Sequence, residues 1–107
     1  MIDLAPAQLA AFEAGAAAAT AMLKALANER RLMILCQLGA GELTVGALQA
    51  RLGVSQSALS QHLSVLREEG VVATRRAGQT IHYRIADPAA VRIIATLIEI
   101  YCPEKKA

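Results

Sequence analysis

Aromatic residues are scarce in this sequence: they make up 3% of its 107 residues, and tryptophan is absent. A core must then be filled by alanine and aliphatic side chains, which is typical of packed helices. Cysteine occurs only twice and never as CxxC, which argues against a structural disulfide and against a CxxC redox motif. The length suits a single core, so we expect residues 1–107 to form one domain.

Long uncharged runs are also missing. The apolar N-terminal stretch is interrupted by Asp3 and Glu13 and has no Lys or Arg before Lys24, so it fits neither a signal peptide nor a membrane span. We therefore expect a cytoplasmic protein without a membrane partner. The net charge is only +2, but residues 51–84 carry five arginines against two glutamates, a local charge of +3. Positive charge is concentrated in this one segment.

Four helices are predicted before residue 70. An alanine-rich stretch indicates the first, over residues 7–27. Asn28, Thr44 and Ser55 are residue types that cap helix N-termini, and each precedes a helical pattern, which predicts helices over residues 29–38, 45–52 and 56–69. Glycines stand where the last two of these helices would end.

The pattern then changes to β-branched runs. VVATRR and TIHYRI are separated by AGQ, which predicts a β-hairpin. Asp87 and Pro88 begin a final helix whose apolar residues occupy more than one face. A small domain cannot bury all of that surface, so we expect a homodimer joined by the first and last helices.

The order of helix, turn, helix and basic hairpin is that of a winged helix-turn-helix. The predicted fold is therefore mainly α with a β-hairpin wing, with residues 44–69 as the helix-turn-helix and residues 71–85 as the wing. In the helix over residues 56–69, Leu59, Leu63 and Leu66 share one stripe and are predicted to face the core.

The opposite stripe of that helix is polar and nearly uncharged, which suits close approach to base edges. An ordinary solvated face is the alternative, but such faces usually carry Lys and Glu. Wing arginines suit phosphate or minor-groove contact, although surface strands also carry arginine. The predicted DNA-binding residues are Ser55, Gln56, Ser57, Ser60, Gln61, His62, Ser64, Arg67, Arg75, Arg76 and Arg84. His62 borders the apolar stripe, where we also expect it to be a structural histidine held by a hydrogen bond.

The segments LANERRLMILCQL and LTVGALQARLGVSQSALSQHLSVLREEGVVATRRAGQTIHYRI resemble the ArsR/SmtB family of dimeric bacterial transcriptional regulators. The resemblance covers roughly residues 18–103 and is most specific in SQSALSQHLSVLREEGVV. It implies a homodimer that binds an inverted-repeat operator in double-stranded DNA, most often as a repressor released by an inducer. No enzymatic activity and no cofactor are expected.

Two metal sites are familiar in that family, and this sequence lacks both ligand sets. One uses CxC in the third helix, where this chain has Thr44 and Gly46. The other uses Asp and His of the last helix; here Asp87 is present, but Ala89 stands two residues later and no histidine follows. Two thiols alone are a poor zinc set, so we expect no metal.

The two cysteines are the remaining candidates for an inducer site. By itself, Cys36 suits a small buried hydrophobe, and Cys102 a neutral terminal residue. Their positions are similar, however, to those of a branch of the family that responds to reactive sulfur species or oxidants. In that branch, cysteines of the second and last helices become linked by a di- or polysulfide, and operator affinity falls. The resemblance thus implies that Cys36 and Cys102 are redox-sensing residues.

Positive charge near the two cysteines is also expected to matter. Arg30, Arg31 or Lys105 would favour the reactive thiolate.

The protein class and the sign of regulation have alternatives. The regulator would be a repressor, or alternatively a derepressor that displaces a nucleoid protein. A thiol enzyme or a winged-helix module that binds only protein is the other alternative, but no nucleophile–base set can be assembled from two histidines and two cysteines.

Overall fold

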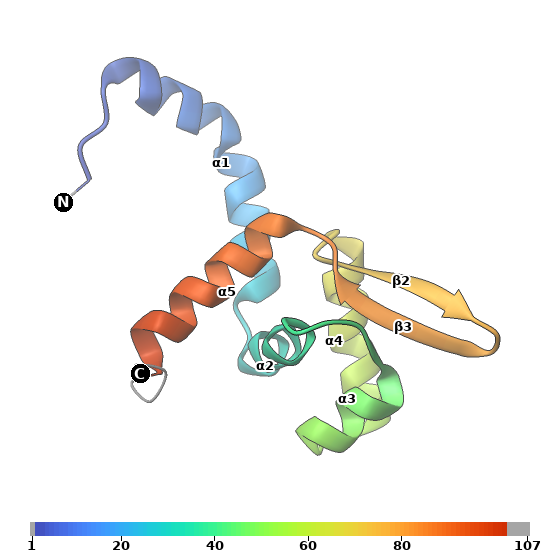
Figure 1. The fold of residues 1–107 in the computed structure, drawn as a ribbon. Helices are drawn as coiled ribbons and strands as arrows, with labels where there is room; N and C mark the ends of the chain where they lie inside the picture. Colours follow the sequence, from blue (N-terminus) through green and yellow to red (C-terminus); the bar gives the residue numbers. More distant parts are fainter. Residues whose placement is uncertain (1, 103–107) are drawn as a thin grey trace.

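The computed structural model describes residues 2–102 and contains five helices and three strands (Figure 1). In chain order they are α1 (Pro6–Leu26), α2 (Glu29–Leu38), β1 (Leu43–Thr44), α3 (Val45–Leu52), α4 (Gln56–Glu68), β2 (Val72–Ala77), β3 (Thr80–Ile85) and α5 (Pro88–Tyr101). The predicted helices and hairpin are confirmed, and the predicted boundaries lie within one residue of those observed. The short strand β1 was not predicted.

The helix ends are formed as their capping residues predict. Asn28 Oδ1 accepts hydrogen bonds of 2.9 and 3.1 Å from two N–H groups in the first turn of α2. Thr44, Ser55 and Asp87 each accept one from the first turn of α3, α4 and α5, respectively. Gly53, with φ of 65°, ends α3 in the left-handed region. Each side-chain cap is typically worth about 0.5–2 kcal/mol.

The core lies where α2, α3 and α4 meet the base of the sheet. Leu35, Leu48, Leu59 and Leu66 have no exposed surface, and Leu63 has 1%. The prediction that the α4 leucines face inward is therefore confirmed. Burial of each such side chain contributes about 1.5–3 kcal/mol, so this stripe fixes α4 against its neighbours.

The sheet is antiparallel, with the strand order β1-β3-β2. Strand β1 pairs with β3 through Leu43 opposite Tyr83 and Thr44 opposite His82. Since Thr44 also caps α3, the start of α3 is attached directly to the hairpin.

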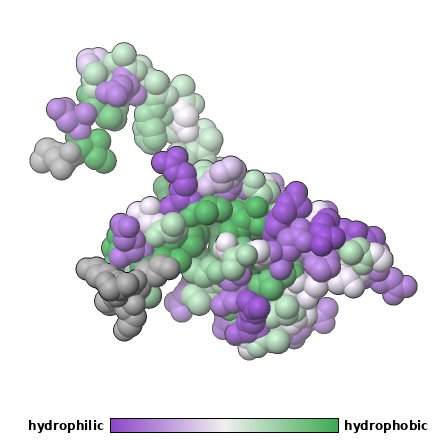
Figure 2. All heavy atoms as spheres, in the orientation of Figure 1, coloured by the Kyte–Doolittle hydropathy of each residue, from purple (hydrophilic) through white to green (hydrophobic). Residues whose placement is uncertain are grey.

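Helix α1 extends away from the rest of the molecule (Figure 1), and its buried residues are Ala25 and Leu26 at its C-terminal end. Figure 2 shows that it is largely apolar, whereas the wing is largely hydrophilic. Its mean hydropathy is 1.3 over a window of 18 residues, of which only 11% are buried. By length and composition α1 is long and apolar enough to cross a membrane, despite Glu13. Core helices of soluble proteins and signal sequences share these properties.

Candidate nucleic-acid interface and thiol pair

Helix α4 exposes the polar stripe that was predicted to read DNA. With Leu59, Leu63 and Leu66 buried, the opposite face is left open to solvent. The capping oxygen of Ser55 accepts the N–H of Ala58 at 3.2 Å and fixes the first turn. The exposed polar residues of this segment are Ser55, Gln56, Ser57, Ser60, Gln61 and Ser64. Arg67 is exposed as well, in the last turn of the helix.

The wing divides its arginines between two faces. Arg75 lies opposite His82, and Arg84 opposite Ala73, so these four side chains share one face of the hairpin. Arg76 lies on the other face, opposite Ile81. All three arginines are exposed, as a phosphate contact requires.

Arg75 has an acidic partner that sequence analysis did not predict. Its Nε donates to both carboxylate oxygens of Glu42, at 2.7 and 3.0 Å. Glu42 lies just before β1, 33 residues away in the chain. The remaining guanidinium nitrogens of Arg75 are not used by this pair. Between residues 2 and 102, Arg76 and Arg84 have no ion pair.

His62 does not have the hydrogen bond that was expected of it. Within residues 2–102 its ring makes none, and the side chain is half-buried beside the N-terminus of α2. Burial lowers the pKa of His62, and the positive charges of Arg31 and Arg30 lower it further. The expectation of a hydrogen-bonded structural histidine was therefore wrong, because α2 presents cations rather than an acceptor to this ring.

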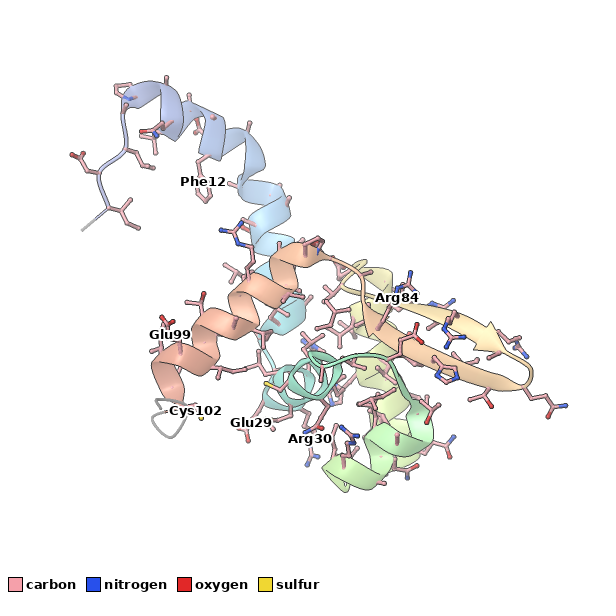
Figure 3. The ribbon with its side chains drawn as sticks, viewed as in Figure 1. Phe12, Glu29, Arg30, Arg84, Glu99 and Cys102 are labelled. Atoms are coloured by element: carbon pink, nitrogen blue, oxygen red, sulfur yellow. The ribbon has the colours of Figure 1, made fainter. Side chains whose placement is uncertain are left out.

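The two cysteines lie on elements that contact each other. Cys36 is on α2, half-buried against the hydrophobic core. Cys102 is the C-cap of α5, where its N–H donates to Ile98 at 2.9 Å; it is also half-buried (Figure 3). Both are free thiols, and α5 packs against α2. The fold thus brings together two helices whose cysteines are 66 positions apart in the sequence.

The expected activation of the thiol by arginine does not occur at Cys36. Burial raises the pKa of the Cys36 thiol, which disfavours the thiolate. Arg31 is directed elsewhere: its guanidinium donates to the carbonyl oxygens of Ala25 at 2.6 Å and Lys24 at 3.2 Å, at the end of α1. Lys105, which was also expected to favour the thiolate, lies outside the described residues.

Metal ligands do not gather in the part of the chain that the structure describes. Among residues 2–102, no three His, Cys, Asp or Glu side chains lie close enough to hold an ion.

A supported helix with an open polar face, followed by a basic hairpin, defines a winged helix-turn-helix protein that binds DNA. The chain belongs to the ArsR family: residues 28–74 match the family described as "Bacterial regulatory protein, arsR family", and close relatives extend the match over nearly the whole chain.

The transcriptional activator HlyU of Vibrio cholerae is 49% identical over 98 residues, which cover 92% of this chain and 91% of HlyU. The biofilm growth-associated repressor of Agrobacterium fabrum is 45% identical over 105 residues, covering 97% and 90%. A solved structure of reduced HlyU from Vibrio cholerae matches with a TM-score of 0.80 and 49% identity, over 85% of this chain and 96% of that one.

The protein is thus a transcriptional regulator of the ArsR family, and the expectation of a DNA-binding regulator is confirmed. Its homologues are regulators rather than enzymes, so the thiol-enzyme alternative is discarded.

Proposed function

We propose that this protein is a repressor that senses reactive sulfur species through Cys36 and Cys102. The observation that carries the proposal is the placement of the only two cysteines on α2 and at the end of α5, two helices in contact. Helix α2 also packs against α3 and α4. A covalent link between α2 and α5 therefore acts on the helix that supports α3 and α4.

The bridge forms in two steps in which polysulfide is both the sulfur donor and the two-electron oxidant. One thiolate attacks an internal sulfur of an inorganic polysulfide and expels hydrosulfide, which leaves a hydropolysulfide on that cysteine. The second thiolate attacks a sulfur within this chain and expels its end as hydrosulfide, closing the bridge; each thiol loses one proton. Because burial raises the pKa of Cys36, we assign the first attack to Cys102.

We further propose that the working form is a homodimer joined by α1 and α5. Large apolar side chains on these helices are exposed in the single chain, as expected for a surface that a second subunit covers. Leu9 is 57% exposed, Phe12 59%, Leu23 60%, Val91 45% and Ile100 61%. A second copy covers this surface and sets the spacing between two reading helices, about one turn of DNA.

In this proposal each α4 reads one half of an inverted-repeat operator. Gln56 and Gln61 pair with adenine, and the serines of the stripe contact several bases. Arg67, Arg75, Arg76 and Arg84 meet phosphates. Bridging the thiols changes the angle between the DNA-reading helices, α3 and α4, and the dimerisation helices, α1 and α5. The two copies of α4 then no longer fit their half-sites. Coupling of this kind is typically worth about 1–3 kcal/mol, or about 5–150-fold in affinity.

The test measures operator binding by fluorescence anisotropy, with a duplex from the promoter upstream of the protein's own gene. Polysulfide should weaken binding by the reduced wild type, and mass spectrometry should find added sulfur between Cys36 and Cys102 of one subunit. Sulfide, which carries no sulfane sulfur, is the matched control and should have no effect. Cys36→Ser and Cys102→Ser should bind normally and not respond. A Cys102→Ser protein that polysulfide still releases, or a bridge found only between subunits, would disprove the mechanism.

A further inference from the structure

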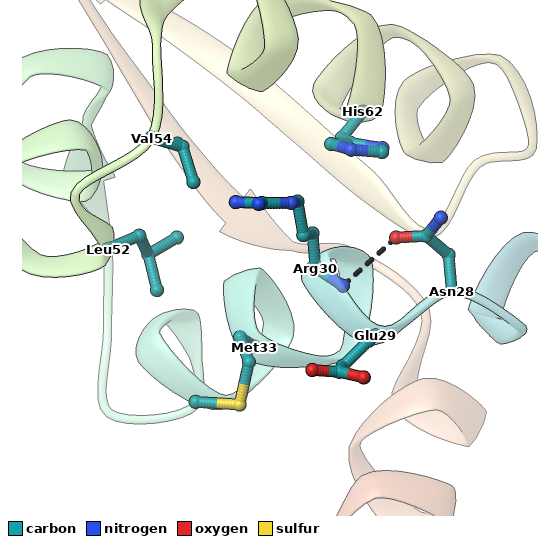
Figure 4. Close-up of a pocket in the computed structure, with 7 residues that line it drawn as sticks. All are labelled: Asn28, Glu29, Arg30, Met33, Leu52, Val54 and His62. Carbon is teal, nitrogen blue, oxygen red and sulfur yellow. Dashed lines mark hydrogen bonds between the residues drawn. The ribbon is translucent and has the colours of Figure 1, made fainter.

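A pocket of about 490 Å³ opens beside the reading helix (Figure 4). The N-terminus of α2 forms one wall, α4 another, and the turn between α3 and α4 a third. Leu52, the last residue of α3, and Val54, in the turn after it, make this third wall apolar. His62 lines the pocket from α4, and it directly follows Gln61 of the polar stripe. Whatever binds in this pocket therefore lies against the flank of the helix that reads DNA.

Nitrogen donors from two helices face this space. Asn28 Oδ1 is occupied by its two capping hydrogen bonds, which leaves the amide nitrogen available. Figure 4 shows this nitrogen and the guanidinium of Arg30 on the side of α2 that faces His62. Among residues 2–102, the Arg30 guanidinium has no acidic partner. The adjacent carboxylate of Glu29 points away from His62 (Figure 4).

We propose that Asn28, Arg30 and His62 form a binding site for one phosphate-like oxyanion. A guanidinium presents parallel N–H donors that match two oxygens of such a group, and a protonated imidazole and an amide supply further donors. The oxyanion is either a phosphodiester of bound DNA or a free phosphate, which present the same chemistry to these nitrogens. The site uses neither cysteine, so it stands apart from sulfur sensing.

Binding at this site is linked to protonation of His62. The charged groups near the ring are Glu29, Arg30 and Arg31 on α2, while the turn contributes only apolar side chains. Burial and the two arginines lower the pKa of His62 in the empty site. A bound anion offsets the arginine charge and accepts a hydrogen bond from the protonated ring, so it raises that pKa. By linkage, the anion binds more tightly as the pH falls.

The experiment follows the histidine Cε1–H resonances of the reduced protein by NMR while phosphate is titrated at constant ionic strength against chloride. The signal that is lost in His62→Gln is assigned to His62. Phosphate should raise the pKa of His62 saturably, whereas chloride at the same ionic strength should not. Arg30→Gln should weaken this response about tenfold or more, since a hydrogen bond to a charged group is lost. The matched control Arg92→Gln, on α5, should respond as wild type does.

A second titration uses a DNA duplex in place of phosphate. A response of His62 to phosphate alone identifies a free-anion site; a response to the duplex alone, again lost in Arg30→Gln, identifies a contact with the DNA backbone. The proposal is overturned if neither ligand moves the pKa of His62, or if Arg30→Gln and Arg92→Gln respond equally.

Discussion

The ion pair between Glu42 and Arg75 should hold DNA affinity below what the wing can provide. Arg75 is one of the predicted phosphate contacts, yet its Nε already faces a carboxylate at 2.7 Å. The side chains are 51% exposed for Arg75 and 29% for Glu42, so solvent screens the pair. Glu42→Gln removes the negative charge and keeps the shape of the side chain, which makes it the appropriate perturbation.

The magnitude follows from that exposure. Exposed pairs contribute about 0.2–1 kcal/mol, so the free energy of unfolding should fall by about this amount per subunit in Glu42→Gln. DNA binding should change in the opposite direction, because Arg75 is freed to attract phosphate. With two subunits on one operator the gain is about 0.4–2 kcal/mol, or about 2–30-fold tighter binding.

Anisotropy titrations with operator and non-operator duplexes at several salt concentrations measure this effect. Both duplexes should gain equally, since a phosphate contact carries no sequence information. Glu99→Gln on α5 (Figure 3) is the matched control for the change in net charge. Arg75→Ala should weaken binding and reduce the salt slope by about one per arginine. If Glu42→Gln only matched Glu99→Gln, Arg75 would not be a phosphate contact; if it bound operator more weakly, the pair would instead serve to hold the wing in position.

Two other predictions concern base reading and assembly. Gln61→Ala should weaken operator binding by about 1–3 kcal/mol and relax sequence choice, and unchanged affinity and specificity in a binding-site selection would show that the reading face is wrongly assigned. Phe12→Glu should give monomers by light scattering and abolish specific operator binding, while the helical signal in circular dichroism persists. Phe12 is 59% exposed in the single chain, so the variant would bury an unpaired charge at the interface. A stable dimer of this variant would exclude α1 from that interface.

Short-range features of this fold could be predicted because their causes lie within one helical turn. Ser55 and Thr44 accept N–H groups three residues ahead, and the α4 leucines are separated by three or four residues. Strand β1 could not be predicted, because two residues show no periodicity and its partner, β3, lies about 40 residues further along the chain.

The candidate site was predictable only in part, for similar reasons. The exposed polar stripe of α4 follows from helical spacing, but the pair of Arg75 and Glu42 depends on tertiary structure. Arg30 and Arg31 precede Cys36 by six and five residues, whereas side chains three or four apart share a helix face. Proximity in the sequence therefore gave the wrong electrostatic environment for this thiol.

Because β1 holds β3 in place, the length of the wing beyond this pairing can change without moving the base of the hairpin. The base of the hairpin is fixed by Val72, which is 2% exposed, and the middle of β3 is fixed by the pairing of Thr44 with His82. The chain turns at Gly78, with φ of 65°, beyond both of these positions. Adding one residue to each strand at the tip would lengthen the hairpin by about 3.4 Å and direct the turn toward the opposite face, and adding two would restore its direction. Small insertions at the tip would therefore change what the wing can contact, while α4, the proposed reading helix, keeps its place.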